Sequence, residues 1–131
     1  MAPTMTRTQL ISSIYDAFKS GDIPYILNQI APGAQWRQSK TLPWGGDYSG
    51  PQGAREFFEK LDANIETVSF DPRENIEKGD EVFSFGTYAG RSRKTGRTGT
   101  AEWMFRWRVE DGKIAGWESY IDTAALVQAL E

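Results

Sequence analysis

The sequence predicts an α+β fold in which three N-terminal helices pack on one face of a strongly curved, mixed or antiparallel sheet. A short helix is expected at the C-terminal end. Two observations support this class. Apolar residues recur with a helical period in the first half of the chain, and long segments of alternating apolar and polar residues fill the second half. Helices followed by long strands are typical of α+β domains.

The first three helices are each indicated by an apolar stripe or by capping residues. Residues 8–20 carry a stripe at positions i, i+3, i+4 and i+7, formed by Ile11, Ile14, Tyr15 and Phe18. Gly21 is suited to end this helix, and a second, short helix is expected over 23–30. A third helix begins near Pro51, with a buried face formed by Phe57, Phe58, Leu61 and Ile65.

Strands are expected over the rest of the chain. A brief first strand is predicted at 34–39, followed by a loop rich in Gly and Pro, LPWGGDYSGPQG. Four longer strands are predicted at 66–77, 81–93, 97–110 and 113–121. Asp122 then provides an N-cap for the closing helix, 124–130.

The segment 101–122 is the most informative part of the sequence, because it holds three of the five tryptophans. Trp103, Phe105 and Trp107 alternate with polar or charged residues and Met104, so their rings share one face of a strand. Asp111-Gly112 is a strong signal for a tight hairpin turn. A strand with three large rings on one side must cover them, and we expect the binding pocket at this face.

Length and composition limit the function. The 131 residues fit one domain, expected over residues 8–131 after a flexible N-terminal tail at residues 1–7. The chain contains no Cys and no His, which removes thiolate chemistry, the commonest general base and the commonest metal ligand. We therefore expect no metal site and no cofactor.

Charge and hydropathy exclude further classes of partner. The net charge is −3 and the isoelectric point is near 5.1, which argues against nucleic-acid binding. No apolar run approaches the roughly 20 residues that span a bilayer, and no signal-peptide core precedes the domain. A cytoplasmic protein without membrane attachment is expected.

Several local signatures resemble one known group of proteins. They are the first helix ending in SGD, then APGAQW, then WGGDYSGPQGAREFFEKL, and the final VEDGKIAGWESYIDTAALVQAL. In order and spacing they resemble SnoaL-like proteins of the ketosteroid isomerase and nuclear transport factor 2 superfamily. The resemblance implies a cone-shaped α+β fold with one apolar pocket between the concave sheet face and the helices. It also implies a homodimer formed through the sheet.

The catalytic residues of that superfamily match this sequence poorly. Ketosteroid isomerase uses an Asp base facing a Tyr and a neutral Asp. By the resemblance, the base position falls at Gln38 and the neutral acid at Phe105, where many SnoaL-like proteins would carry a His. Tyr15 lies one residue from the expected tyrosine position, which Ile14 occupies. The Asp-Arg-Asp set of limonene epoxide hydrolase, another relative, cannot be assembled from these residues.

Nine residues are candidates for lining a ligand pocket: Trp36, Gln38, Trp44, Tyr88, Trp103, Phe105, Trp107, Trp117 and Ser119. Large rings suit flat, apolar ligands, since ring stacking adds about 0.5–1.5 kcal/mol per pair beyond burial. The alternative is that these rings simply fill the core. A buried indole N–H needs a partner, which a ligand oxygen, Gln38 or Ser119 could supply.

The candidate catalytic residues are Tyr15, Asp122 and Asp47. Tyr15 could donate a hydrogen bond to a developing enolate, or could be a half-buried tyrosine with its hydroxyl in water. Asp122 is expected to cap the last helix unless it acts as a base, and Asp47 could be a turn residue. Strict alternation turns Glu118 outward, unless a bulge reverses it.

Two hypotheses for function follow. The first is a cofactor-independent enzyme of the isomerase, dehydratase or cyclase type that acts on a small hydrophobic molecule. It requires a carboxylate within about 4 Å of the pocket. The second is a non-catalytic module of the same fold, which binds a small apolar ligand or serves as a dimeric interaction domain.

Overall fold

The computed structural model describes residues 5–131, which fold into four helices and six strands. In chain order the elements are α1 (Arg7–Ser20), α2 (Ile23–Asn28), β1 (Ile30–Gln38), β2 (Gly46–Ser49), α3 (Gly50–Asn64), β3 (Ile65–Lys78), β4 (Glu81–Ser92), β5 (Thr98–Glu110), β6 (Lys113–Ile121) and α4 (Thr123–Leu130). The predicted order of elements, with three helices before the long strands and a short helix at the end, is confirmed.

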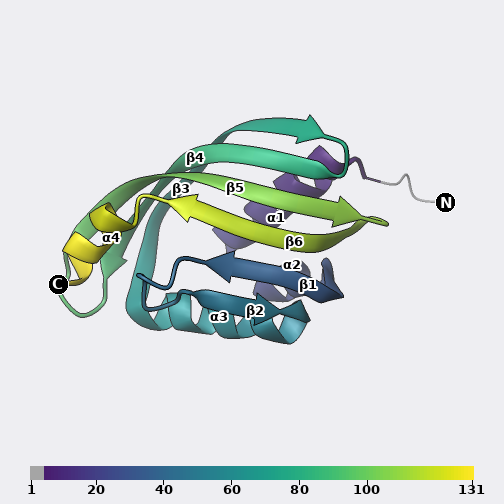
Figure 1. The fold of residues 1–131 in the computed structure, drawn as a ribbon. Coiled ribbons are helices and arrows are strands. Elements are labelled where there is room, and N and C mark those ends of the chain that lie inside the picture. The colour runs from purple at the N-terminus through teal and green to yellow at the C-terminus, as the bar shows by residue number, and fades with distance from the viewer. Residues whose placement is uncertain (1–4) are drawn as a thin grey trace.

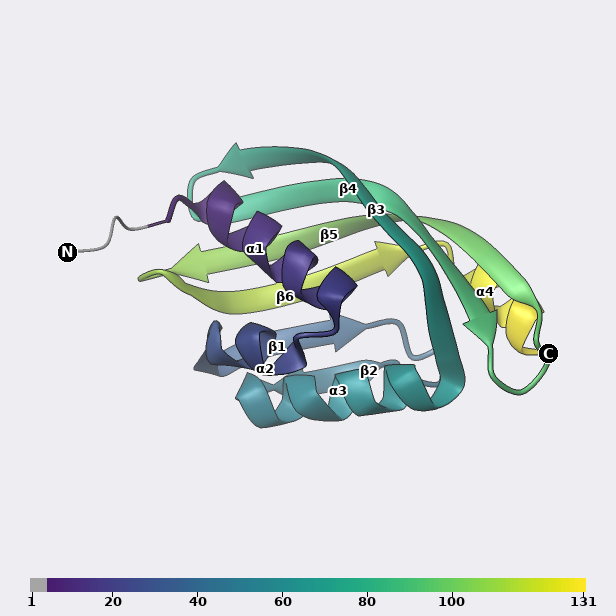
Figure 2. The ribbon, with the colours of Figure 1, turned by 180° about the vertical axis from the view of Figure 1, so that it is seen from behind.

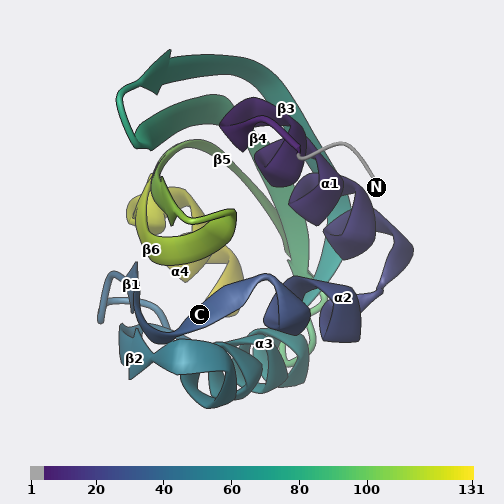
Figure 3. The same ribbon diagram turned by 90° about the vertical axis from the view of Figure 1, so that its right-hand side faces the viewer.

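The six strands form one mixed sheet in the order β2-β1-β6-β5-β4-β3 (Figure 1). β1 and β6 are parallel, and the other neighbours are antiparallel. The helices α1, α2 and α3 lie on one face of this sheet (Figures 2 and 3), while α4 packs at the far end, where the Thr95 hydroxyl donates to the backbone oxygen of Ala129. A core forms between the three helices and the inner sheet face.

The sheet is less curved than predicted. We expected a strongly curved sheet closing a cone, whereas this sheet is open, with β2 and β3 at its edges. β4 and β5 pair without a bulge from Glu81↔Arg108 to Arg91↔Thr98, and bulges are what bend a sheet sharply. The register shifts twice between β3 and β4, and once each between β1 and β6 and between β5 and β6.

Two element boundaries differ from those predicted near the N-terminus. α1 begins at Arg7 because Thr6 and Gln9 form a capping box, in which each side chain bonds the other's backbone N–H; residues 1–4 of the predicted tail lie outside the described residues. β1 begins at Ile30, so Ala31-Pro32-Gly33 lies within a strand. The β1–β6 register shifts between Ile30 and Gln35, and Pro32, which has no N–H to donate, is tolerated in that interruption.

The loop predicted at residues 42–53 contains a strand. β2 covers only Gly46–Ser49 and pairs with β1 through Trp36↔Tyr48 and Arg37↔Asp47. The strand has only four residues and is largely polar, so the sequence shows no period-2 pattern there. Asp47 and Tyr48 are therefore strand residues, and the turn between β1 and β2 is limited to residues 39–45.

The predicted facing of the aromatic hairpin is confirmed. On β5, Trp103, Phe105 and Trp107 are buried, while Glu102, Arg106 and Arg108 are exposed. Asp111 and Gly112 both have positive φ, 51° and 73°, as the tight turn requires. The inner face of β5 is thus aromatic, and the outward-facing residues of this strand are mostly charged or polar.

Candidate ligand-binding cavity

A cavity of about 80 Å³ lies between the helices and the inner face of the sheet. Its wall is formed by aromatic and aliphatic side chains together with Gln38: Ile14, Tyr15, Phe18, Ile26, Trp36, Trp44, Phe57, Phe58, Leu61, Phe70, Tyr88, Phe105, Trp107, Trp117, Ile121 and Leu126. Within residues 5–131, no charged side chain lines it. Its volume is about half that of an engineered cavity of roughly 150 Å³ that binds benzene.

Seven of the nine predicted pocket residues line this cavity: Trp36, Gln38, Trp44, Tyr88, Phe105, Trp107 and Trp117. Trp103 does not. Its ring is stacked between Phe70 and Phe105, at centroid distances of 5.2 and 4.0 Å, and it lies over Gly86, where an added Cβ would approach the indole to 2.4 Å. Ser119 is also outside the wall, although its inward position beside Phe105 is as expected.

Tyr15 lies in the middle of the inner face, held by hydrogen bonds. Trp107 Nε1 donates to the Tyr15 hydroxyl at 2.8 Å, and the same hydroxyl is hydrogen-bonded to Ser84. Ser84 in turn donates to Asn75 Oδ1 at 2.5 Å. Tyr15 is 5% exposed, so the alternative of a half-buried tyrosine with its hydroxyl in water is wrong.

Burial dominates the electrostatics of Tyr15. It raises the pKa of the phenol well above its usual value, and the hydrogen bonds with Ser84 and Trp107 offset only part of that effect. The phenol is therefore neutral throughout the physiological pH range, and its hydroxyl already has two protein partners. Tyr15 therefore connects α1 to the inner face of the sheet through its hydrogen bonds.

Two indole N–H groups on the cavity wall have no partner. Trp36 and Trp117 lie opposite each other on β1 and β6, with ring centroids 4.5 Å apart and planes inclined by 30°. Both side chains are buried, and neither Nε1 has a hydrogen-bond partner among the described residues. Trp103 Nε1 and Ser119 Oγ are the other buried polar atoms without a partner in that part of the chain.

The other polar groups on the wall are engaged in the protein. Gln38 Oε1 accepts from the backbone N–H of Ser39 at 3.0 Å, and the Tyr88 hydroxyl is hydrogen-bonded to Thr67 Oγ1 at 3.1 Å. Burial raises the pKa of Tyr88, so this phenol is also neutral. Gln38 could still orient a ligand through its amide nitrogen, which makes no hydrogen bond to any residue from Met5 to Glu131.

None of the candidate carboxylates lines the cavity. Asp47 is on the opposite face of the sheet, where Arg37 Nε donates to it at 2.9 Å and lowers the pKa of its carboxyl. Glu118 shares that outer face and accepts a hydrogen bond of 2.8 Å from the Tyr120 hydroxyl. Asp122 is exposed and caps α4 through the N–H of Ala125 at 3.4 Å, as the capping alternative predicts.

A surface groove of about 980 Å³ adjoins the cavity, and it is lined by the end of α1, by α2 and α3, and by the first half of β3. Four side chains line both spaces: Phe18, Phe58, Leu61 and Phe70. Phe18 packs edge to face on Phe70 at 5.1 Å and lies 6.2 Å from Phe58. These four side chains, which we call the aromatic wall, separate the cavity from the groove.

Sequence reasoning missed the aromatic wall as part of the site. Its helical members were predicted as buried faces of their helices, because the period of 3.6 residues shows which side of a helix is covered. Which of those residues meet a cavity depends on how α1 and α3 lie against β3, and no local pattern carries that information.

The cavity is on the inner face of a known fold. A profile of the SnoaL-like domain matches residues 11–117 of the chain. The chain belongs to the SnoaL-like family. The resemblance predicted from the sequence is confirmed. No curated protein matches the chain significantly.

Solved structures agree with this SnoaL-like assignment. A nuclear transport factor 2-like (NTF2-like) protein from Burkholderia thailandensis is 28% identical, with 98% of this chain and 99% of that one covered and a TM-score of 0.91. An NTF2-like protein of unknown function from Burkholderia pseudomallei is 27% identical, with 96% and 98% covered and a TM-score of 0.88. TerC, co-crystallised with polyporic acid, is 29% identical, with 94% and 96% covered and a TM-score of 0.81.

The described part of this SnoaL-like domain contains neither a cluster of metal ligands nor a membrane-spanning helix. Across residues 5–131, no three acidic, His or Cys side chains gather as they would around a metal ion. In the same part of the chain, no helix is long and apolar enough to cross a membrane.

Proposed function

We propose that this SnoaL-like domain binds a small, uncharged and largely apolar molecule in its internal cavity. The observation that carries the proposal is the cavity wall itself, which joins the rings of Trp36, Phe105, Trp107 and Trp117 around one space without a charged group from residues 5–131. Concave, mostly apolar spaces with a few polar groups are typical ligand sites. A charged ligand would lose its hydration there without gaining a counter-ion.

The enzyme hypothesis has less support. Isomerisation, dehydration or cyclisation by acid–base catalysis needs a group that accepts a proton within hydrogen-bond reach of the substrate. Both candidate carboxylates lie on the surface, where Asp47 forms an ion pair with Arg37 and Asp122 caps the N-terminus of α4. Tyr15 is buried and engaged by Trp107 and Ser84, which makes it a poor acid. The non-catalytic binding module is therefore the function that the geometry favours.

Binding of small molecules also agrees with the relatives. TerC, at 29% identity, has been co-crystallised with polyporic acid. A ligand would reach the cavity of this chain from the groove, by displacement of the aromatic wall. Its aromatic members, Phe18, Phe58 and Phe70, are only half-buried, so these rings have fewer neighbours to restrain them than Trp36 or Trp107.

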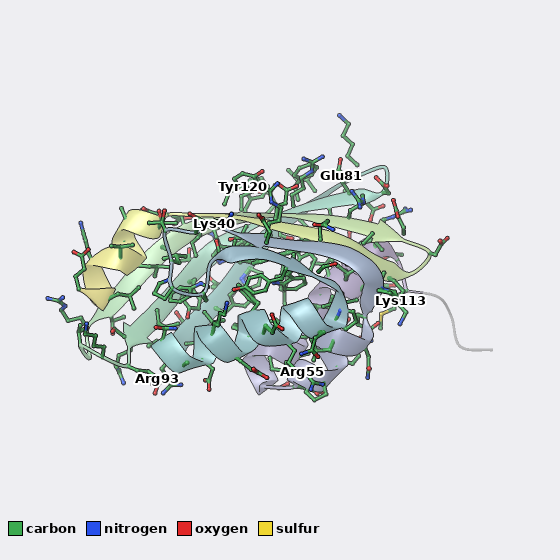
Figure 4. All side chains as sticks on the ribbon, turned by 60° about the horizontal axis from the view of Figure 1, so that its bottom comes forward. Lys40, Arg55, Glu81, Arg93, Lys113 and Tyr120 are labelled. Atoms are coloured by element: carbon green, nitrogen blue, oxygen red, sulfur yellow. The ribbon has the colours of Figure 1, made fainter. Side chains whose placement is uncertain are left out.

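Dimerisation through the sheet belongs to the same proposal. Half-buried Phe83, Phe85 and Met104 lie on the outer face, and Tyr120, which is 53% exposed, projects from it (Figure 4). None of the helices α1–α3 covers this face. A second copy would bury these side chains, and sedimentation analysis of the wild-type chain and of Tyr120→Arg tests this. A dimer that dissociates in the variant is expected, whereas a wild-type monomer would contradict it.

Binding in the cavity can be tested with a probe of matching size. Methylenecyclobutane, a hydrocarbon of five carbons, should shift the indole NMR signals of the cavity tryptophans at millimolar concentration. Ile121→Phe places a larger side chain in the wall and should abolish those shifts, while the fold is checked by circular dichroism. Shifts that persist in Ile121→Phe, or no binding to the wild-type chain, would contradict the proposal.

A further inference from the structure

We infer that the ligand carries a hydrogen-bond acceptor oxygen, as in a ketone or an ether, and that the indole N–H groups of Trp36 and Trp117 bind it. The inference rests on the proposed function and names the chemical class of the molecule in the same cavity. Neither indole nitrogen has a partner among residues 5–131, and both side chains line the cavity.

An unpartnered buried N–H is rare in native proteins. The large majority of buried side-chain polar atoms are hydrogen-bonded, and each exception calls for an explanation. The indole nitrogen only donates, so it can be satisfied only by an acceptor. Trp107, the third tryptophan considered on the cavity wall, does have a partner: its Nε1 donates to the Tyr15 hydroxyl at 2.8 Å.

The described residues of the cavity wall offer no free acceptor for these two donors, and Ser119 Oγ, which also lacks a partner, lies outside that wall. The Tyr15 hydroxyl already binds Trp107 and Ser84, the Gln38 carbonyl oxygen accepts from Ser39, and the Tyr88 hydroxyl is paired with Thr67. Two residues with unpartnered indole donors therefore line a wall on which the acceptors of the described residues belong to groups that are already bonded. A ligand oxygen fills that deficit.

The arrangement of the two rings suits one shared ligand. Trp36 and Trp117 are register partners on adjacent strands, with centroids 4.5 Å apart. An oxygen has two lone pairs and can accept from both. Phe57 and Phe105, at centroid distances of 5.3 and 5.1 Å from Trp117, supply apolar surface for the carbon skeleton.

The cavity wall formed by residues 5–131 is uncharged, and this limits which acceptor group the ligand can carry. A carboxylate or phosphate ligand would need a cation, and within residues 5–131 no Lys or Arg lines the cavity. Alcohols and amines bring donors of their own, for which the wall has no free acceptor. A neutral ketone or ether is the class that fits both limits.

The test compares two probes of the same shape. Cyclobutanone and methylenecyclobutane differ only in C=O against C=CH₂, and the indole N–H signals of the ¹⁵N-labelled chain report each tryptophan separately. Cyclobutanone should move the Trp36 and Trp117 indole protons downfield, as a new hydrogen bond does, whereas methylenecyclobutane should shift these signals without that downfield displacement. Trp36→Phe and Trp117→Phe should each reduce the preference for the ketone by about two- to tenfold.

Trp103→Phe is the matched control, because Trp103 also has a buried N–H without a partner but does not line the cavity. It should leave the preference unchanged. If both probes bind and neither indole moves downfield with the ketone, the acceptor inference is wrong while cavity binding stands. If neither probe binds, the proposed function itself fails. The spectra of the wild-type chain decide even where a Trp→Phe variant does not fold.

Discussion

Trp107 and Tyr15 are joined across the core by a hydrogen bond of 2.8 Å from the indole nitrogen to the phenolic oxygen. The two residues are 92 positions apart in the chain, and the bond ties α1 to the centre of the sheet. Tyr15 also packs on Phe70 and Trp103, at centroid distances of 5.3 and 5.9 Å. The residue that most resembles a catalytic acid is thus part of the framework around the cavity.

Removing the Tyr15 hydroxyl should lower stability. Tyr15→Phe leaves the buried Trp107 N–H unpaired, and we expect the free energy of unfolding to fall by about 1–3 kcal/mol. Denaturant titration measures this. Tyr25→Phe is a matched control, since its hydroxyl donates to Ser13 in a half-buried position and its loss should cost less than about 1 kcal/mol. Equal effects of the two changes would contradict a central role for Tyr15.

The ionisation of Tyr15 gives a pH signature. Burial raises its pKa in the folded state, so the folded chain holds this proton more tightly than the unfolded chain, whose tyrosine ionises near pH 10. Stability should therefore be independent of Tyr15 below about pH 9 and should fall as pH rises above about 10. The slope of unfolding free energy against pH in that upper range should be shallower in Tyr15→Phe. Identical slopes would show that the phenol is not buried.

Features set by neighbouring residues could be predicted from the sequence, whereas features set by contacts between distant segments could not. Alternation along 101–122 was enough to place Trp103, Phe105 and Trp107 on one face, because strand facing is a local property. The same alternation could not show that Trp103 would be covered by Phe70 and Phe105 and so be kept out of the cavity.

The carboxylates illustrate the same limit. Asp122 was recognisable as a cap because an N-cap is defined by the three residues that follow it. Asp47 was assigned to a loop because the glycines at 45 and 46 are typical of turns, whereas its pairing with Arg37 depends on the β1–β2 ladder. The curvature of the sheet was overestimated for a related reason, since bulges are set by inter-strand register.

Asp122 provides a direct test of capping against catalysis. Asn is as good an N-cap as Asp, so Asp122→Asn should keep both stability and ligand binding, while Asp122→Ala should cost about 1 kcal/mol. Thermal or denaturant unfolding and probe titration measure the two properties. A loss of ligand binding or turnover in Asp122→Asn without a loss of stability would restore the acid–base hypothesis.

The aromatic wall should control how fast ligands enter. Phe58→Leu removes part of the barrier between groove and cavity. If the free energy of displacing the aromatic wall falls by about 1.4 kcal/mol, methylenecyclobutane should associate about tenfold faster. Stopped-flow tryptophan fluorescence follows the rate. Phe57→Leu is the control on the same helix, because Phe57 lines the cavity but not the groove. A rate that changes equally in both variants would place the entrance elsewhere.

The central claim is that the space between the helices and the inner sheet face is a ligand site. A crystal structure determined under xenon pressure tests it most directly, because xenon occupies apolar cavities and is visible without any assumption about the natural ligand. We predict a xenon atom in the cavity, in contact with Trp36, Phe105 and Trp117. Xenon bound only in the surface groove, or an empty cavity at saturating pressure, would contradict the account.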